Sequence, residues 1–145
     1  MKGYKRILVP VDGSELSDLA FERALGFARM VDGKVTIVNV IHDIVGPAGP
    51  TSVPLQIDQT EIARDLLEDY IRKTEKSGIE VDSHIRHGHP ADEIVELSKE
   101  HDIIIMGSKG HNPLSSLLLG SVAEKVVRHA FCPVMIVRQK EQDQE

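Results

Sequence analysis

The sequence has no tryptophan, three phenylalanines and two tyrosines among its 145 residues. An interior built from it must be aliphatic, and β-branched aliphatic residues favour strands. Aromatic side chains on which single-stranded nucleic acid stacks are correspondingly scarce. The single cysteine excludes an internal disulfide, and no leader with a charged and then an apolar region opens the chain. We therefore expect a cytoplasmic protein.

Positive charge and long apolar runs are also in short supply. The formal net charge is −6, so binding to nucleic acid or to an anionic membrane is not expected. No apolar run approaches the roughly 18 residues that a membrane-spanning helix needs. The phosphate-binding pattern Gly-x4-Gly-Lys-Ser/Thr is absent. The 41% of apolar residues and the chain length predict one globular domain over residues 1–145.

Short apolar runs alternate with longer segments of helical periodicity. The runs predict five strands, over residues 6–11, 34–41, 79–86, 102–107 and 134–138. The helical segments cover residues 15–31, 56–77, 90–101 and 121–130. This alternation predicts an α/β fold, an open five-stranded parallel sheet with four helices on both faces. The clearer alternation of residues 79–86 is typical of an edge strand, and the proline-rich residues 42–55 are expected to lie over a sheet end.

Two loops are equipped to bind an anion at the carboxyl ends of the strands, where open parallel sheets bind ligands. One follows the first strand and contains Asp12. The other follows the fourth strand and contains Gly107, Gly110 and Gly120-Ser121. Glycine lets backbone N–H groups approach a phosphate, and a helix beginning at Ser121 adds unpaired N–H groups and a positive dipole end. Lys109 and His111 are candidates to add positive charge.

Each of these residues also has a purely structural interpretation. Gly107 can simply end a strand, Gly120 can form a turn, and Ser121 with Glu124 has the spacing of a capping box. For Asp12, capping of the first helix is the preferred interpretation, and it is compatible with a hydrogen bond from a ribose hydroxyl.

Two further candidates have weaker support. His84, His87 and His89 form the only histidine cluster, but a solvated surface is preferred to a metal site because no Cys or carboxylate completes a familiar spacing. Cys132 lies between Phe131 and Pro133 and is interpreted as a small buried apolar residue. Neither candidate is assigned a chemical role.

The spacing Gly-x2-Gly-x9-Gly-Ser is met by Gly107, Gly110, Gly120 and Ser121, and it resembles the ATP-binding branch of the universal stress protein family. Residues 7–14, 104–108, 118–124 and 132–137 resemble the family in the same order, so the likeness covers about residues 3 to 138. The resemblance implies a sheet in the strand order 3-2-1-4-5. It also implies a homodimer joined through the last strand, with one nucleotide per subunit.

The resemblance further implies a role for individual residues. Asp12 would contact the ribose, the Val40 backbone the adenine edge, and Gly107 the region between ribose and phosphate. The whole implied nucleotide-binding set is Pro10, Val11, Asp12, Val40, Met106, Gly107, Gly110, His111, Gly120, Ser121 and Val122. The nucleotide would be ATP or AMP, and a Mg²⁺ or Mn²⁺ ion on its phosphates stays an open alternative. Lys109 stands where such loops often carry His or Arg, which leaves the choice among ATP, ADP and AMP open.

Three hypotheses for function follow. The first is a stress-response or signalling protein that acts as a nucleotide-dependent switch. The second is a slow ATPase or phosphotransferase, for which Asp12 is the sole candidate and no catalytic residue is assigned. The third is a dimeric interaction module without nucleotide, and the glycines argue against it.

Overall fold

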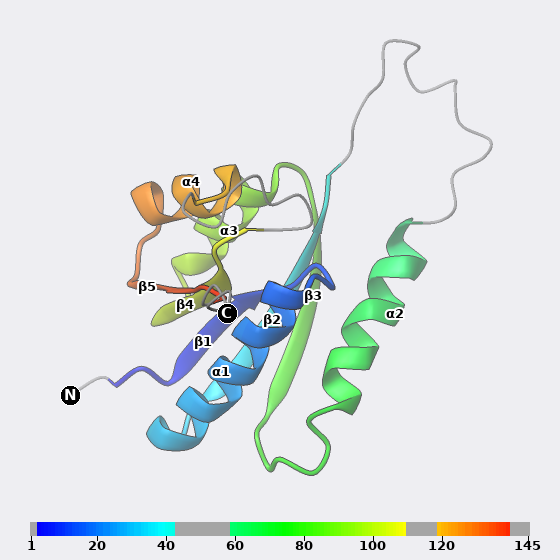
Figure 1. Cartoon of the computed structure of the whole chain (residues 1–145). Coiled ribbons are helices and arrows are strands. Elements are labelled where there is room, and N and C mark those ends of the chain that lie inside the picture. The colour runs from blue at the N-terminus through cyan, green and yellow to red at the C-terminus, as the bar shows by residue number, and fades with distance from the viewer. Residues whose placement is uncertain (1–2, 43–58, 110–118, 140–145) are drawn as a thin grey trace, which may run out of the picture.

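Strands and helices alternate along the chain as the hydrophobic pattern predicts (Figure 1). The structure is a computed structural model, and it describes residues 3–42, 59–109 and 119–139. The strands are β1 (Arg6–Pro10), β2 (Lys34–Ile41), β3 (Val81–His87), β4 (Ile103–Gly107) and β5 (Val134–Val137). The helices are α1 (Glu15–Val31), α2 (Gln59–Arg72), α3 (Pro90–Ser98) and α4 (Ser121–His129).

All five strands are parallel and lie in the order β3-β2-β1-β4-β5, which confirms the predicted fold. Leu8 in the central strand β1 pairs with Thr36 of β2 on one side and Ile104 of β4 on the other. The chain therefore adds strands first on one side of β1 and then on the other. The carboxyl ends of β1 and β4 form the switch point at which α/β sheets of this kind bind ligands.

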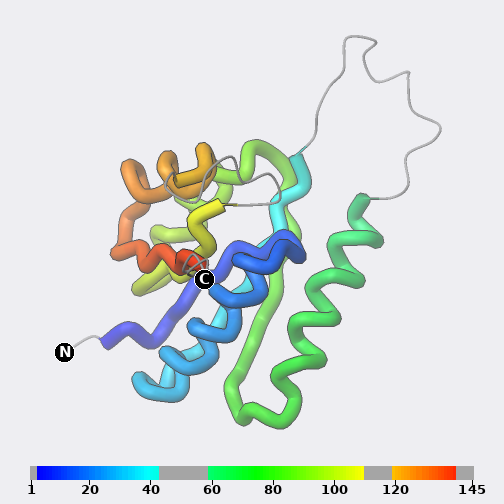
Figure 2. The backbone as a smooth tube through the Cα atoms, viewed as in Figure 1, coloured from blue at the N-terminus to red at the C-terminus, as the bar shows by residue number. Residues whose placement is uncertain are grey.

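The helices cover both faces of the sheet, as predicted. Successive residues of a strand point to opposite faces, so a continuously apolar strand presents apolar side chains to the helices on each face. Ile7 and Val9 of β1 pack in a core cluster with α1 and α2, and Leu8 packs in a second cluster with α3 and α4. Figures 1 and 2 show α3 and α4 together on one side of the sheet and α2 alongside β3. β3 is an edge strand with alternating exposure, as predicted.

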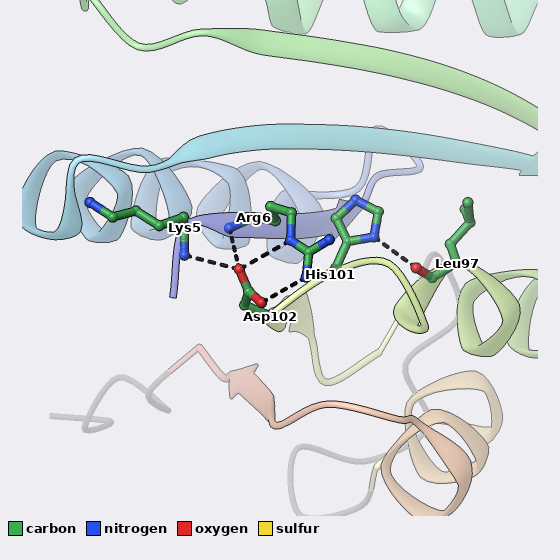
Figure 3. Close-up of polar contacts among 5 residues, drawn as sticks. All are labelled: Lys5, Arg6, Leu97, His101 and Asp102. Atoms are coloured by element: carbon green, nitrogen blue, oxygen red, sulfur yellow. Dashed lines mark hydrogen bonds and ion pairs between the residues drawn. The ribbon is translucent and has the colours of Figure 1, made fainter. Parts of the chain in front are cut away.

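A polar cluster joins β1 to β4 at the amino edge of the sheet (Figure 3). One carboxylate oxygen of Asp102 accepts from the backbone amides of Lys5, at 3.1 Å, and Arg6, at 2.8 Å. The other oxygen accepts from the Arg6 guanidinium at 3.1 Å. The hydrogen bond from the Arg6 side chain, together with those from the amides, holds the pKa of Asp102 below its ordinary value. These hydrogen bonds join β1 to β4 at the edge of the sheet opposite the carboxyl ends of the strands.

Helix α2 differs from its prediction in its bounds and in one core residue. It ends at Arg72, and the predicted residues 56–58 lie outside the described part of the chain. Its buried positions are Ala63, Leu67 and Tyr70. Ile62 recurs with Leu66 and Tyr70 at a spacing of four, which predicts that it lies on the core face, but it is 54% exposed. The buried stripe passes through Ala63 at a spacing of three and four, so Ile62 falls on its solvent side.

Candidate functional site

The loop between β1 and α1 is held from both sides of its backbone. The Val11 amide donates to the Val38 carbonyl at 2.9 Å, which continues the pairing of β1 with β2. The Asn39 side-chain amide donates to the Val11 carbonyl at 2.8 Å. Both polar backbone groups of Val11 are therefore hydrogen-bonded to residues of β2, and these bonds fix the position of the chain where the loop begins.

Asp12 does not cap α1, and the prediction that it does is wrong. Ser14 is the N-cap: its backbone is extended, and its hydroxyl accepts from the Ser17 amide at 3.2 Å. The Asp12 carboxylate instead accepts from the amide of Ser14 itself, at 2.9 Å, within the turn that precedes the helix. The Ser14 oxygen thus lies in reach of the third amide of the helix, which an N-cap side chain commonly binds. Asp12 is left at the edge of the sheet, partly exposed, with its carboxylate braced by the turn.

Tyr70 of α2 contacts the first turn of α1, which directly follows this loop. Its hydroxyl donates to the Asp18 carboxylate and lies 2.9 Å from the Ser17 hydroxyl. The Ser17 hydroxyl in turn accepts from the Asp12 amide at 3.0 Å. Burial raises the pKa of the Tyr70 phenol, and the neighbouring Asp18 carboxylate raises it further. The phenol therefore keeps its proton at neutral pH and acts as a permanent donor.

Gly107 ends β4 at a close contact with the first turn of α1. A Cβ atom at this position would lie 3.0 Å from the Cβ of Leu16 and 3.2 Å from the Leu16 carbonyl carbon. Contacts this short are tighter than most real Cβ contacts, so the neighbour would have to give way, and here the neighbour is the first turn of a helix. The glycine thus brings the start of α1 directly against the end of β4.

Gly120 makes a second close approach, between the start of α4 and the end of β4. Its amide donates to the Ser108 carbonyl at 2.8 Å. An added Cβ would lie 3.3 Å from both that carbonyl oxygen and the Cα of Lys109. Ser108 is itself held to β5, because its amide donates to the Val137 carbonyl at 3.0 Å. The start of α4 is therefore tied through Ser108 to two strands of the sheet.

The N-cap of α4 is Gly120, so the predicted capping box of Ser121 and Glu124 does not form. Ser121 is the first helical residue, and its side chain is exposed. The first intrahelical bond runs from the Glu124 amide to the Gly120 carbonyl, at 2.9 Å. The amides of residues 121–123 precede that bond and have no partner within the helix. Together with the positive end of the helix dipole they form a favourable place for an anion.

The structure brings most of the predicted site residues to one edge of the sheet. Pro10 is the last residue of β1, Gly107 is the last residue of β4, and Val40 precedes the last residue of β2. Met106 is 5% exposed and packs in the core beneath the site, so its side chain serves packing. The predicted residues Gly110 and His111 lie outside the described part of the chain, as does nearly all of the proline-rich loop.

Three residues at the site were missed by the sequence analysis. Ser17, Asn39 and Tyr70 all bind the loop that carries Asp12, either directly or through one another. A signal was available for each. Asn39 interrupts the apolar run of β2, Ser17 lies on the apolar face of α1, and Tyr70 carries a hydroxyl on the apolar face of α2.

No preformed metal centre is found in residues 3–42, 59–109 and 119–139, where no group of three His, Cys, Asp or Glu side chains is arranged to hold a metal ion. His89 instead lies beside His42, with a ring-centroid separation of 5.0 Å.

Burial raises the pKa of the Cys132 thiol, which is partly buried. In the part of the chain that the structure describes, no helix has the length and apolar character needed to cross a membrane. The cytoplasmic location stays a prediction.

Comparisons with known proteins agree on one family. A sequence profile described as the Universal stress protein family matches residues 3–138. A universal stress protein of Methanocaldococcus jannaschii is 34% identical, over 97% of this chain and 85% of the relative. The solved structure of a universal stress protein from Lactobacillus plantarum is 27% identical with a TM-score of 0.82, over 95% of this chain and 100% of that one. A universal stress protein solved in complex with cAMP is 25% identical with a TM-score of 0.71, over 94% of this chain and 99% of that one.

Proposed function

Because this chain belongs to the universal stress protein family, we propose that it binds an adenine nucleotide at the carboxyl edge of β1 and β4 and acts as a nucleotide-dependent switch in stress response or signalling. One observation carries the proposal. Gly107 and Gly120 let the starts of α1 and α4 approach the end of β4 so closely that an added Cβ atom would make an unusually tight contact with the neighbouring chain. A relative of 25% identity was solved with cAMP, which supports an adenine nucleotide as the ligand.

In this proposal the two loops divide the ligand between them. The Asp12 carboxylate accepts hydrogen bonds from the ribose hydroxyls, and the backbone of Val40 lies along the adenine edge. The amides of Ser121 and Val122 receive the phosphates with the help of the α4 dipole, and Gly110 and His111 complete the phosphate loop. A carboxylate cluster for Mg²⁺ or Mn²⁺ is missing from the described residues, so such an ion would be carried by the phosphates.

We also propose that the protein is a homodimer joined through β5. This strand is the sheet edge opposite β3, so one side of its backbone has no neighbouring strand among the residues that the structure describes. Exposed apolar side chains occur in β5 and in the segment that leads into it: Val127 of α4 is 47%, Phe131 65% and Met135 of β5 38% exposed. A second copy would cover them, and bound nucleotide would change the contacts between the two copies.

The first test is mass spectrometry of the nucleotide released when the purified protein is denatured, combined with calorimetric titration of ATP. Release of intact ATP is the expected result for a switch. A hydrolysed product would favour the slow ATPase, and the absence of both bound nucleotide and ATP affinity would favour the interaction module. These outcomes separate the three hypotheses.

The second test is the variant Gly120→Val. Gly120 has φ −69° and ψ 165°, which valine adopts readily, so the fold should persist. The new side chain would push the backbone of Ser108 and Lys109 away from the start of α4. We expect ATP affinity to fall at least about tenfold, the scale of one lost charge-assisted hydrogen bond. Gly26→Val in α1 is the control, because nothing lies within 4 Å of an added Cβ there. Unchanged ATP affinity in Gly120→Val would contradict the proposed site.

A further inference from the structure

We propose that Tyr70 is a positioning residue for ribose recognition: through Ser17 it holds the backbone of Asp12 and so directs the Asp12 carboxylate. The inference rests on the proposed nucleotide site and adds to it a residue from a different helix. Tyr70 is 52 residues along the chain from Asp18, the nearer of its two partners in sequence. The contact therefore joins α2 to the first turn of α1, the helix that follows the loop carrying Asp12.

The direction of every hydrogen bond in this relay follows from the carboxylate at its end. Asp18 can only accept, so the Tyr70 hydroxyl proton points toward Asp18. The Ser17 hydroxyl must then donate to the Tyr70 oxygen, 2.9 Å away. With its own proton so placed, the Ser17 oxygen presents a lone pair to the Asp12 amide at 3.0 Å. The phenol thus holds the Ser17 hydroxyl proton away from the Asp12 amide, so that a lone pair of Ser17 stays directed at that amide.

Burial makes the relay rigid. Tyr70 is 2% and Ser17 5% exposed, so water cannot replace a lost partner cheaply. The Tyr70 ring is held independently by an edge-on contact with Phe21, at a centroid separation of 5.0 Å. α2 also lies directly against the loop, because an added Cβ on Gly13 would be 3.3 Å from a methyl group of Leu66. The hydroxyl can therefore be removed with the ring left in place.

The relay acts on one part of the ligand only. Asp12 faces the ribose in the proposed complex, whereas the phosphates lie at the start of α4, which is anchored through Ser108. Loss of the phenol should leave phosphate binding intact and weaken the preference for a nucleotide that carries ribose hydroxyls. A residue with a merely structural role would lower the affinity for both kinds of nucleotide alike.

The experiment compares ATP with 2′,3′-dideoxy-ATP by calorimetric titration of the full chain. The wild type should prefer ATP about tenfold or more, the scale of a hydrogen bond to a carboxylate. In Tyr70→Phe we expect this preference to fall at least about threefold, with the affinity for dideoxy-ATP unchanged within about twofold. Tyr4→Phe is the matched control: it alters the other tyrosine of the chain, which is 45% exposed and precedes β1, and should change neither affinity.

A double-mutant cycle adds a second criterion. Ser17→Ala removes the hydroxyl through which Tyr70 acts on Asp12. Adding Tyr70→Phe to this variant should therefore reduce the preference for ATP over dideoxy-ATP no further. Additive losses, or a Tyr70→Phe protein that keeps the wild-type preference, would overturn the positioning role while leaving the nucleotide site standing. A wild type that binds neither nucleotide would overturn the proposed function as well.

Discussion

Asp102 illustrates how much a single side chain does at the amino edge of the sheet. It binds two backbone amides and a guanidinium with one carboxylate, and its side chain is only 19% exposed. The amides belong to the segment that opens β1, and Asp102 itself directly precedes β4. The two central strands are therefore joined by charge-assisted hydrogen bonds at the edge of the sheet opposite the proposed ligand site.

Asp102 should make the stability of the protein depend on pH in the acid range. Its pKa is lowered from 3.8 on folding, so the stabilisation is complete above about pH 4 and is lost as the pH falls below that value. Asp102→Asn should reduce the free energy of unfolding at pH 7 by about 1 to 2 kcal/mol and flatten its decline with acid. Urea unfolding between pH 3 and pH 7 measures both effects.

Asp82→Asn is the control for this prediction. Asp82 forms an ion pair with Lys34 at 2.6 Å, but its side chain is 50% exposed. Pairs of this kind contribute little in water, so the variant should stay within about 0.5 kcal/mol of the wild type. Equal losses in the two variants would show that burial of the Asp102 network is not what stabilises the strands.

At the scale of elements, the two helices that begin at the site, α1 and α4, have different N-caps. α1 begins with a serine cap whose hydroxyl binds the Ser17 amide, and α4 begins with a glycine that has no side chain to offer. An amide in the first turn of α1 is thus bound by the cap side chain, whereas no cap side chain binds the first amides of α4, which can bind a partner outside the helix. This difference supports the proposed division of the nucleotide, with phosphates at α4 and the sugar at the braced turn before α1.

Two matched serine variants test that difference. Ser14→Ala removes the cap of α1 and should lower the free energy of unfolding by about 1 kcal/mol, measured by urea unfolding without nucleotide. Ser121→Ala changes an exposed first-turn residue that caps nothing, so it should have little effect on the same measurement. A larger loss in Ser121→Ala than in Ser14→Ala would mean that the caps are assigned to the wrong residues.

On the scale of the whole molecule, apolar side chains are exposed in β5 and just before it, although the chain carries a net charge of −6. The exposed side chains Val127, Phe131 and Met135 come from the end of α4, the turn after it and the edge strand. A strand edge flanked by such residues is a site at which sheets extend from one molecule to the next. The homodimer proposed above would cover it.

Met135→Glu should therefore convert the dimer to monomer, because it places a charge beside the pairing edge. Met30→Glu is the matched control: it makes the same change near the end of α1, at a residue that is 78% exposed. Sedimentation velocity over a range of protein concentrations distinguishes the two. A Met135→Glu protein that remains dimeric, or a wild type that is monomeric at all concentrations, would exclude β5 as the interface.

Sequence pattern was sufficient for most of the architecture and for part of the site. Buried parallel strands are short apolar runs, and edge strands alternate, so hydrophobic pattern alone was enough to recognise the five strands. The glycines could be recognised as well, but their structural reason could not. That Gly107 admits the backbone of Leu16 depends on where α1 packs, which no local pattern encodes.

The amino-acid order by itself determined the alternation of strands and helices and the family, because these follow from periodicity and from motifs along the chain. Only the tertiary structure decided that Ser14 and Gly120 are the caps, that Ile62 is exposed and that Tyr70 reaches Ser17 from another helix. The reason is physical. Periodicity records which side of an element is apolar, whereas a hydrogen bond between distant residues depends on how two elements lie against each other.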